Sequence, residues 1–446
     1  MTSSWKIVFT EDLFRSLNKF LFRTAPSENG CFLLGNYCKT KKGQDVVIIT
    51  KIIKPMEDSW RYKGSDYLSP TSSFINQAII EAEKLDSCLI FVHTHPQFTP
   101  AWFSNIDKKT NKEMFANISQ ILDRPLGSLV FSKGEIYGVM YKDRKEQPIS
   151  NYTISGQLFF EYDKVKPKKL DKKFDRQYNA IGKENNSKLQ NMTISIVGVG
   201  GTGSALAVQL ARMGVKELQI FDHDVISKTN IPRVYGAKDS DCGRPKVDVL
   251  KEHITTFSKC KVNVFRNNIT KTDLISTLTD SDLIFSCTDN LTSRAVLNDV
   301  ALQYYIPLID VGCRIDLDKT KRIFQAIIKI QSVTTNSACL WCTGTLNAKT
   351  ILQESLTKKE KQRLVREGYY APIETQPSVV SMTTMAASMG INKLLALLGT
   401  FGPEYASLTQ IELKDGFMIE ENPKILENCI CHKRKGLGDK RRLILG

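Results

Sequence analysis

The sequence has no long apolar run. No stretch approaches the roughly 20 apolar residues that a membrane-spanning helix requires. The opening residues, Met-Thr-Ser-Ser-Trp-Lys, also lack the apolar core of a secretory signal peptide. Neither of the usual marks of a membrane or exported protein is present, so we expect a cytoplasmic location and no membrane partner.

Acidic residues are scarce relative to basic ones. The chain has 47 Asp and Glu against 62 Lys and Arg, which gives a formal net charge of +15. This balance favours acidic partners such as nucleotides or an acidic small protein. Much of the excess lies in two basic runs, at 164–169 and 433–442. Neither run interleaves aromatic residues in the manner of a nucleic-acid groove, so we do not expect nucleic acid as a partner.

Cysteine is absent from residues 343–428, although the chain has eleven cysteines in all. In a cytosolic protein, cysteines serve as metal ligands, nucleophiles or small core residues rather than as disulfides. Six of them stand in apolar or strand-like surroundings and are expected in the core: Cys31, Cys38, Cys88, Cys260, Cys287 and Cys313.

A glycine-rich stretch is the most informative part of the chain. Residues 195–204 read Ser-Ile-Val-Gly-Val-Gly-Gly-Thr-Gly-Ser, and apolar residues at helical spacing follow, which predicts a strand, a tight turn and a helix. Glycine lets the backbone approach a phosphate closely, and the helix N-terminus adds partial positive charge. The glycines concerned are Gly198, Gly200, Gly201 and Gly203. About twenty residues later a second predicted strand ends in Asp222, where a ribose-binding carboxylate belongs. These features alone fit NAD and ATP equally well.

Polar residues further along favour ATP. Asn230, Arg233 and Lys246 follow at intervals that suit a triphosphate, and a hydride-transferring enzyme has no need of these extra cations. Another buried-strand pattern ends in Asp289, which is placed to bind Mg²⁺ beside the phosphates. Taken singly, each residue could be a solvated loop residue. Their order along the chain is what favours nucleotide binding.

From about residue 175 to about residue 399 the chain resembles the ubiquitin-activating superfamily, in its homodimeric MoeB/ThiF/HesA form. The motifs are Gly-x-Gly-Gly-x-Gly, Asp-x-Asp, Asn-x-x-Arg, Gly-x-Pro-Lys and Thr-Asp-Asn. The resemblance implies a Rossmann-like adenylation domain with ATP and Mg²⁺ as cofactors. It assigns the phosphates to Gly201, the ribose to Asp222, the triphosphate to Asn230, Arg233 and Lys246, and Mg²⁺ to Asp289. Arg176 matches an arginine that family members insert into the partner subunit's site, which implies a homodimer.

A second chemical cluster is predicted near the N-terminus. A strand-like run at 88–93 delivers His93 and His95 at i and i+2, so both project from one face. Asp107 follows, and two imidazoles with a carboxylate are typical of a catalytic zinc site. Glu28, at the start of an early strand, could shuttle the proton of a metal-activated water. The alternative is an incidental pair of histidines.

This part resembles the JAB/JAMM (MPN-type) metalloproteases, which cleave bonds after the C-terminal glycine of ubiquitin-like proteins. The resemblance makes Glu28 the general base, His93, His95 and Asp107 the zinc ligands, and Ser104 the hydroxyl that helps to hold the oxyanion. The interval between His95 and Ser104 is one residue longer than the common form.

A second zinc site is predicted from cysteine spacing. Cys339 and Cys342 form a Cys-x-x-Cys knuckle, and MoeB-like relatives complete a structural zinc with a second such pair from the C-terminal tail. Here the second pair is Cys429 and Cys431, which departs from that spacing. His432 could replace one thiolate, and free thiols are the alternative.

The stretch without cysteine falls where activating enzymes usually carry their nucleophile. Three explanations stay open. The enzyme passes its acyl-adenylate directly to an external thiol on a conjugating protein, it uses a cysteine elsewhere such as Cys242, or the domain binds without catalysis. The presence of Arg233, Lys246 and Asp289 argues against the third.

Together the patterns predict an α/β protein of two domains. We expect a JAB/JAMM-type zinc isopeptidase domain at 1–161, a linker at 162–173, and a ThiF/MoeB-like adenylation domain at 174–446. The leading hypothesis is an enzyme that adenylates the C-terminal glycine of a ubiquitin-like protein and also trims or removes that protein. Such fusions resemble bacterial ubiquitin-like conjugation modules, for which family analogy suggests antiviral defence. The alternatives are a sulfur-carrier activator of cofactor biosynthesis and a non-catalytic scaffold.

Overall fold

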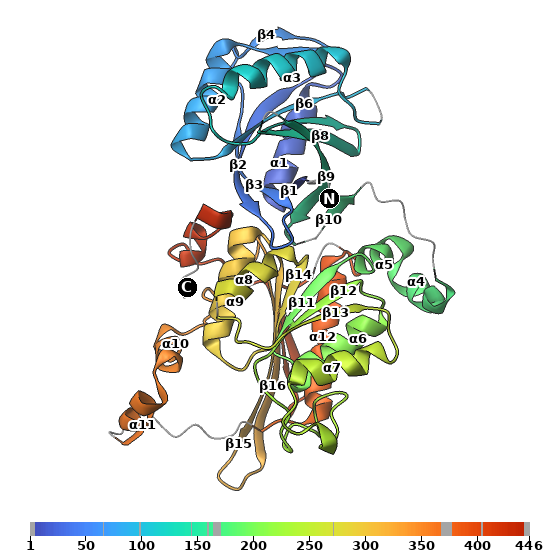
Figure 1. Cartoon of the computed structure of the whole chain (residues 1–446), viewed down its shortest axis with the longest axis vertical. Coiled ribbons are helices and arrows are strands. Elements are labelled where there is room, and N and C mark those ends of the chain that lie inside the picture. Colours follow the sequence, from blue (N-terminus) through green and yellow to red (C-terminus); the bar gives the residue numbers. More distant parts are fainter. Residues whose placement is uncertain are drawn as a thin grey trace. The chain divides into compact units, whose positions relative to one another are not determined.

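The computed structural model describes residues 5–65, 67–97, 100–143, 145–157, 160–163, 171–270, 272–366, 377–402 and 405–440. The chain divides into two compact units (Figure 1). One comprises Met1–Lys166 with Gly436–Arg442, and the other comprises Pro167–Lys435 with Leu443–Gly446. The predicted linker at 162–173 falls largely outside the described residues. Among the helices described, none is both long and apolar enough to cross a membrane.

The N-terminal unit is built on a sheet that closes on itself. Its strands follow the order β1 (Trp5–Thr10), β3 (Asp45–Ile53), β2 (Gly30–Lys39), β6 (Cys88–Thr94), β7 (Leu126–Ser132), β8 (Glu135–Lys142) and β9 (Lys145–Ser155). The first half of β9 pairs with β8, whereas its second half pairs with β1 and closes the ring. Strand β10 (Phe160–Asp163) adds to the outer edge of β9. The predicted α/β content is present, but the closure was not predicted.

Helices cover both faces of this sheet, so its strands are buried on both sides. Helix α1 (Glu11–Leu21) packs one core against alternate strand residues such as Ile90 and Val92. Helices α2 (Ser72–Lys84) and α3 (Asn105–Ile118) pack a second core against Leu89 and Phe91. His93 has the parity of these last two residues, so it lies on the face that α3 covers.

A short C-terminal segment also belongs to the N-terminal unit. The side-chain amide of Asn36 donates to the carbonyl oxygen of Gly436 at 2.7 Å, and the Lys39 backbone N–H donates to the Asp439 carboxylate at 3.1 Å. Gly438 lies against Cys38, since a Cβ built on this glycine would be 3.3 Å from that of Cys38. The predicted boundaries place these residues in the C-terminal domain, but their contacts are with β2.

Deleting residues 436–446 should therefore expose Cys38. This thiol is 3% exposed, and the segment covers it. We expect its alkylation rate to rise at least about tenfold, because the cover is removed without unfolding β2. Peptide mapping after iodoacetamide labelling measures this rate. Cys31, on the same strand but in the core, should keep its slow rate. An unchanged rate at Cys38 would contradict the docking of the segment.

The C-terminal unit contains a doubly wound sheet. Its strand order is β13 (Lys261–Phe265), β12 (Glu217–Phe221), β11 (Thr193–Val197), β14 (Leu283–Ser286), β15 (Leu308–Leu317), β16 (Ile323–Val333), β17 (Leu408–Glu412) and β18 (Phe417–Glu421). The first five strands are parallel, and β16 to β18 continue the sheet in antiparallel fashion. The order reverses between β11 and β14, which is where such sheets bind ligands.

Helices flank this sheet on both faces (Figure 1). Helix α6 (Gly201–Arg212) packs against α12 (Val380–Leu397) and α7 (Lys246–Thr255). Helix α9 (Leu291–Tyr304) packs in the core on the other face. Five shorter helices lie in the described part of this unit: α4 (Asp175–Ile181), α5 (Lys183–Leu189), α8 (Thr272–Ile275), α10 (Ala348–Ser355) and α11 (Lys358–Arg366).

Candidate functional site

A cavity of about 850 Å³ opens at the carboxyl ends of β11, β12 and β14. Its walls come from the glycine-rich turn, the loop after β12, the N-terminal turn of α9 and the antiparallel strands β15 to β17. Seven of the residues predicted to bind nucleotide line it: Gly198, Gly200, Gly201, Asp222, Arg233, Lys246 and Asp289.

Two glycines of the glycine-rich turn have no room for a side chain, whereas a third faces open space. Gly198 has φ +88°, and a Cβ on it would be 2.6 Å from the carbonyl oxygen of Cys287. A Cβ on Gly203 would be 1.9 Å from the carbonyl oxygen of Gly198. Nothing lies within 4 Å of a Cβ built on Gly200, and α6 begins at the next residue without a side-chain cap. The first amides of α6 are thus available to an anion in the cavity.

The two aspartates after β12 have different partners. Asp222 accepts hydrogen bonds from the backbone N–H groups of Val199 and Asp224, which ties the strand end to the glycine-rich turn. Asp224 pairs with Lys246, whose Nζ lies 2.7 Å from the carboxylate. Partial burial raises the pKa of Asp224, but the hydrogen bond and charge of Lys246 outweigh it, so the net shift is downward. Lys246 itself is 7% exposed.

A glutamate from α10 caps the N-terminus of α9. Glu354 accepts hydrogen bonds from the backbone N–H groups of Leu291 and Thr292, at 2.9 and 2.8 Å, and from the Thr292 hydroxyl. Asn290 caps the Ser293 N–H. The first amides of α9 are therefore occupied, which leaves α6 as the helix that offers amides to a phosphate. Asp289 lies in the turn just before this cap and is exposed to the cavity.

Three predicted residues do not line the cavity. Gly203 is needed for packing, as described above. The Asn230 side chain accepts a hydrogen bond from the Ser227 N–H and stabilises the loop before Arg233. Arg176 is exposed on α4. Conversely, Arg294, Lys329 and Glu354 line the cavity although they were not predicted from the sequence. No local motif marks them, because each reaches the site from a different element.

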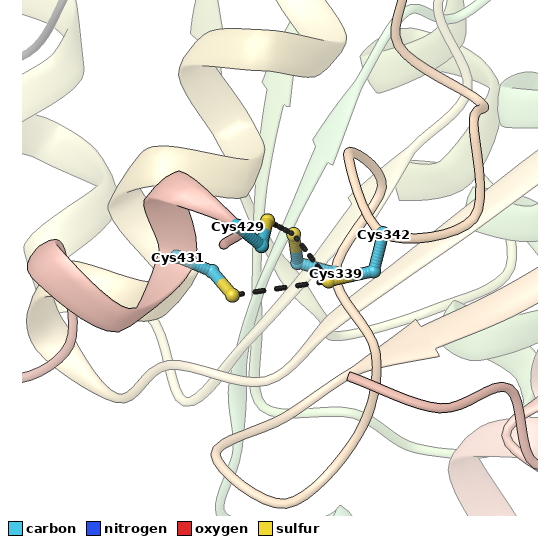
Figure 2. Close-up of side chains that lie close together, drawn as sticks. All are labelled: Cys339, Cys342, Cys429 and Cys431. Atoms are coloured by element: carbon cyan, nitrogen blue, oxygen red, sulfur yellow. Dashed lines mark hydrogen bonds between the residues drawn. The ribbon is translucent and has the colours of Figure 1, made fainter. Parts of the chain in front are cut away.

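The four predicted cysteines meet in one cluster (Figure 2). The sulfur of Cys339 lies 3.7 Å from that of Cys342 and 3.6 Å from that of Cys429, and the Cys342 and Cys431 sulfurs are 3.8 Å apart. Four thiolates around one tetrahedral zinc, with Zn–S bonds of about 2.3 Å, would be spaced by about 3.8 Å. The three distances given above match this spacing, and all four sulfur atoms lie within 4.8 Å of one another. His432 is exposed and contacts the carbonyl oxygen of Leu426 through Nε2.

The N-terminal unit brings the other predicted metal ligands together. Nε2 of His93 lies 3.2 Å from one Asp107 oxygen, and Nε2 of His95 lies 3.3 Å from the other. Glu28 is 3.5 Å from His95 and 2% exposed. Ser104 caps α3 by accepting from the Asp107 N–H, while its own N–H donates to the Asp107 carboxylate. Ser104 thus positions Asp107.

Electrostatics within this cluster suit a cation. Burial raises the pKa of Asp107, but the close approach of both histidines outweighs it and holds the pKa well below its usual range. For His95, burial lowers the pKa, whereas Asp107 and the charge of Glu28 raise it, and the net shift is upward. Both ring nitrogens of His93 are buried without a hydrogen-bond partner in the described structure. A metal ion bound by these groups would satisfy such a nitrogen.

Comparison with known proteins identifies the C-terminal part. The ThiF family model matches residues 174–432. The chain belongs to the ThiF family. Its ThiF domain therefore contains both the cavity and the cysteine cluster.

Individual relatives of this ThiF protein match only in part. The tRNA threonylcarbamoyladenosine dehydratase of Bacillus subtilis is 34% identical over 152 residues, covering 33% of this chain and 59% of the relative. The SAMP-activating enzyme E1 of Haloferax volcanii is 29% identical over 130 residues (29% and 48%). The molybdopterin-synthase adenylyltransferase of Escherichia coli is 28% identical over 137 residues (30% and 55%). The chain spans less than two thirds of the length of each.

Proposed function

We propose that the ThiF domain adenylates the C-terminal carboxylate of a ubiquitin-like or sulfur-carrier protein with ATP. The observation that carries the proposal is the convergence of seven motif residues on one cavity with free helix amides. Membership of the ThiF family and the names of the relatives, which include an activating enzyme and an adenylyltransferase, support it.

Each residue of the cavity would have a separate role in this adenylation. Amides of the glycine-rich turn and α6 would bind the triphosphate, with Arg233 and Lys246 countering its charge. Asp222 would accept from the ribose, and Asp289 would hold Mg²⁺. A carboxylate oxygen then bonds to the α-phosphorus while the bond to the β-phosphate oxygen breaks, so pyrophosphate leaves with the electron pair. Asn230 acts indirectly in this proposal, through the loop that carries Arg233.

We further propose a homodimer in which Arg176 serves the partner's site. Its support is that Arg176 is exposed and lies away from the cavity of its own chain. The cysteine cluster would hold a structural zinc through Cys339, Cys342, Cys429 and Cys431, without His432. Because the ThiF domain has no cysteine between residues 343 and 428, the adenylate would pass to an external thiol on a conjugating enzyme or to a sulfur donor. Cys242 does not line the cavity.

The N-terminal unit supports a second candidate activity. We propose that it is a JAMM-type zinc hydrolase that trims or removes the same carrier, on the evidence of its buried cluster of two histidines and two carboxylates. His93, His95 and Asp107 would hold the zinc, which when bound acidifies a water molecule. Glu28 would take and return that proton. Ser104 retains a hydroxyl near the site but also caps α3. A role in bacterial ubiquitin-like conjugation follows if both activities are present.

Pyrophosphate exchange tests the adenylation proposal. The full chain is incubated with Mg·ATP, labelled pyrophosphate and a ubiquitin-like protein ending in Gly-Gly. We expect label to enter ATP only when the carrier is present. Exchange should be absent with a carrier whose terminal carboxyl is amidated, because no nucleophile remains. No exchange with any Gly-Gly carrier would leave the scaffold alternative, whereas detection of a thiocarboxylate after a sulfur donor is added would favour the sulfur-carrier alternative.

A further inference from the structure

Five lysine and arginine side chains line the nucleotide cavity, and three of them are already paired. Lys246 pairs with Asp224, Arg294 with Asp310 at 3.1 Å, and Arg314 with Asp316 at 2.9 Å. The remaining two are Arg233 and Lys329. Neither makes an ion pair with any carboxylate in the described part of the unit. These two are therefore the cavity cations whose charge no carboxylate of the described unit offsets at close range.

These two cations lie on different elements. Arg233 lies beside the glycine-rich turn, since a Cβ on Gly201 would be 3.3 Å from its Cδ. Lys329 lies on β16, where it pairs in register with Gly312 of β15 and with Gln410 of β17. All three line the cavity. Residues in register across neighbouring strands share a face, so they form a row, which we call the β16 row: Gly312, Lys329 and Gln410.

A residue that does not belong to the β16 row holds the Lys329 side chain in place. Its Nζ donates to the hydroxyl of Thr345 at 2.9 Å. Thr345 follows the cysteine knuckle, in the segment that leads to α10. An ammonium group has three donors, so two stay available to a ligand. Glycine at 312 adds no side chain to the row, where a Cβ would lie 3.3 Å from the Arg294 guanidinium. The amide of Gln410 can hydrogen bond to peptide groups.

Adenylation requires two anions in one cavity. The triphosphate and the attacking carboxylate repel each other, and each needs its own positive charge. The glycine-rich turn and Arg233 supply the phosphate side. We propose that Lys329 binds the C-terminal carboxylate of the carrier and aligns it for attack, with Gln410 contacting the preceding peptide group. This inference rests on the proposed adenylation and names the feature that the site recognises: a free carboxylate on a slim, glycine-like tail.

Substitution of Lys329 separates carrier binding from nucleotide binding. In pyrophosphate exchange with a Gly-Gly carrier, Lys329→Met should raise the KM for the carrier about 10- to 100-fold, as expected for the loss of one charge-assisted hydrogen bond. The KM for ATP should change less than about twofold. Lys329→Arg keeps the charge and should recover most of the loss. Lys414→Met is the matched control, because Lys414 is exposed, packs over Phe324 and does not line the cavity.

Calorimetric binding of Mg·ATP keeps this test independent of folding. Lys329→Met should bind Mg·ATP as the wild type does, which shows an intact cavity. A wild type that exchanges with the carrier while Lys329→Met keeps the wild-type carrier KM would overturn the inference alone. An equal rise in both KM values would also overturn it, since Lys329 would then support the cavity as a whole. A wild type without any carrier-dependent exchange would overturn the proposed function on which the inference rests.

Discussion

Lys246→Met should reduce carrier-dependent pyrophosphate exchange by about 10²- to 10³-fold, the usual cost of removing one group that stabilises developing charge. The side chain is almost fully buried and its Nζ lies 2.7 Å from Asp224. The substitution removes a cation and also leaves the Asp224 carboxylate unpaired beside the triphosphate. Both changes act against binding of the phosphates.

A double substitution distinguishes these two contributions. Asp224→Asn removes the repelling carboxylate, so the Lys246→Met, Asp224→Asn variant should recover about tenfold of the lost exchange. Lys251→Met, on the exposed side of the same helix, should exchange at the wild-type rate. If the double variant is no better than Lys246→Met alone, Asp224 does not face the nucleotide, and our account of this ion pair is wrong.

Glu28→Gln should reduce cleavage of a Gly-Gly carrier bearing a C-terminal extension by about 10²- to 10⁴-fold, the range for loss of a general base. Glutamine matches the shape of the glutamate but cannot accept a proton. Metal analysis should still find zinc in the N-terminal unit, because His93, His95 and Asp107 are unchanged. Asp107→Asn is the contrasting variant and should lose both the activity and the metal. Zinc loss from Glu28→Gln would instead make Glu28 a ligand.

Local sequence motifs anticipated the core of the ThiF domain well. The glycine-rich turn lies within a few residues of its strand and helix, so its conformation depends on neighbours in the chain. Asp222 and Asp289 follow the parallel strands β12 and β14, whose carboxyl ends must meet at one edge of a sheet. The ThiF prediction is confirmed by the family match over 174–432. The roles of individual site residues, and the JAMM and zinc assignments, stay predictions.

Long-range contacts were not predictable in the same way. Glu354 reaches α9 across 62 to 63 residues, and an isolated glutamate in a polar helix has no pattern that reveals its partner. The closure of the N-terminal sheet depends on pairing between β1 and β9, at opposite ends of the unit. In the sequence, residues 433–442 stand out only as a basic run. The contacts of Gly436 and Gly438 with β2 are made by a backbone carbonyl and by a glycine without a side chain, and a charge pattern reveals neither.

An isotope experiment tests the central claim most directly. A Gly-Gly carrier whose terminal carboxylate carries ¹⁸O is turned over by the full chain with Mg·ATP and an acceptor thiol. If the carboxylate attacks the α-phosphate, one ¹⁸O atom passes into the phosphate of the AMP released. We predict labelled AMP together with unlabelled pyrophosphate. Unlabelled AMP, or release of ADP in its place, would contradict adenylation of the carrier by this cavity.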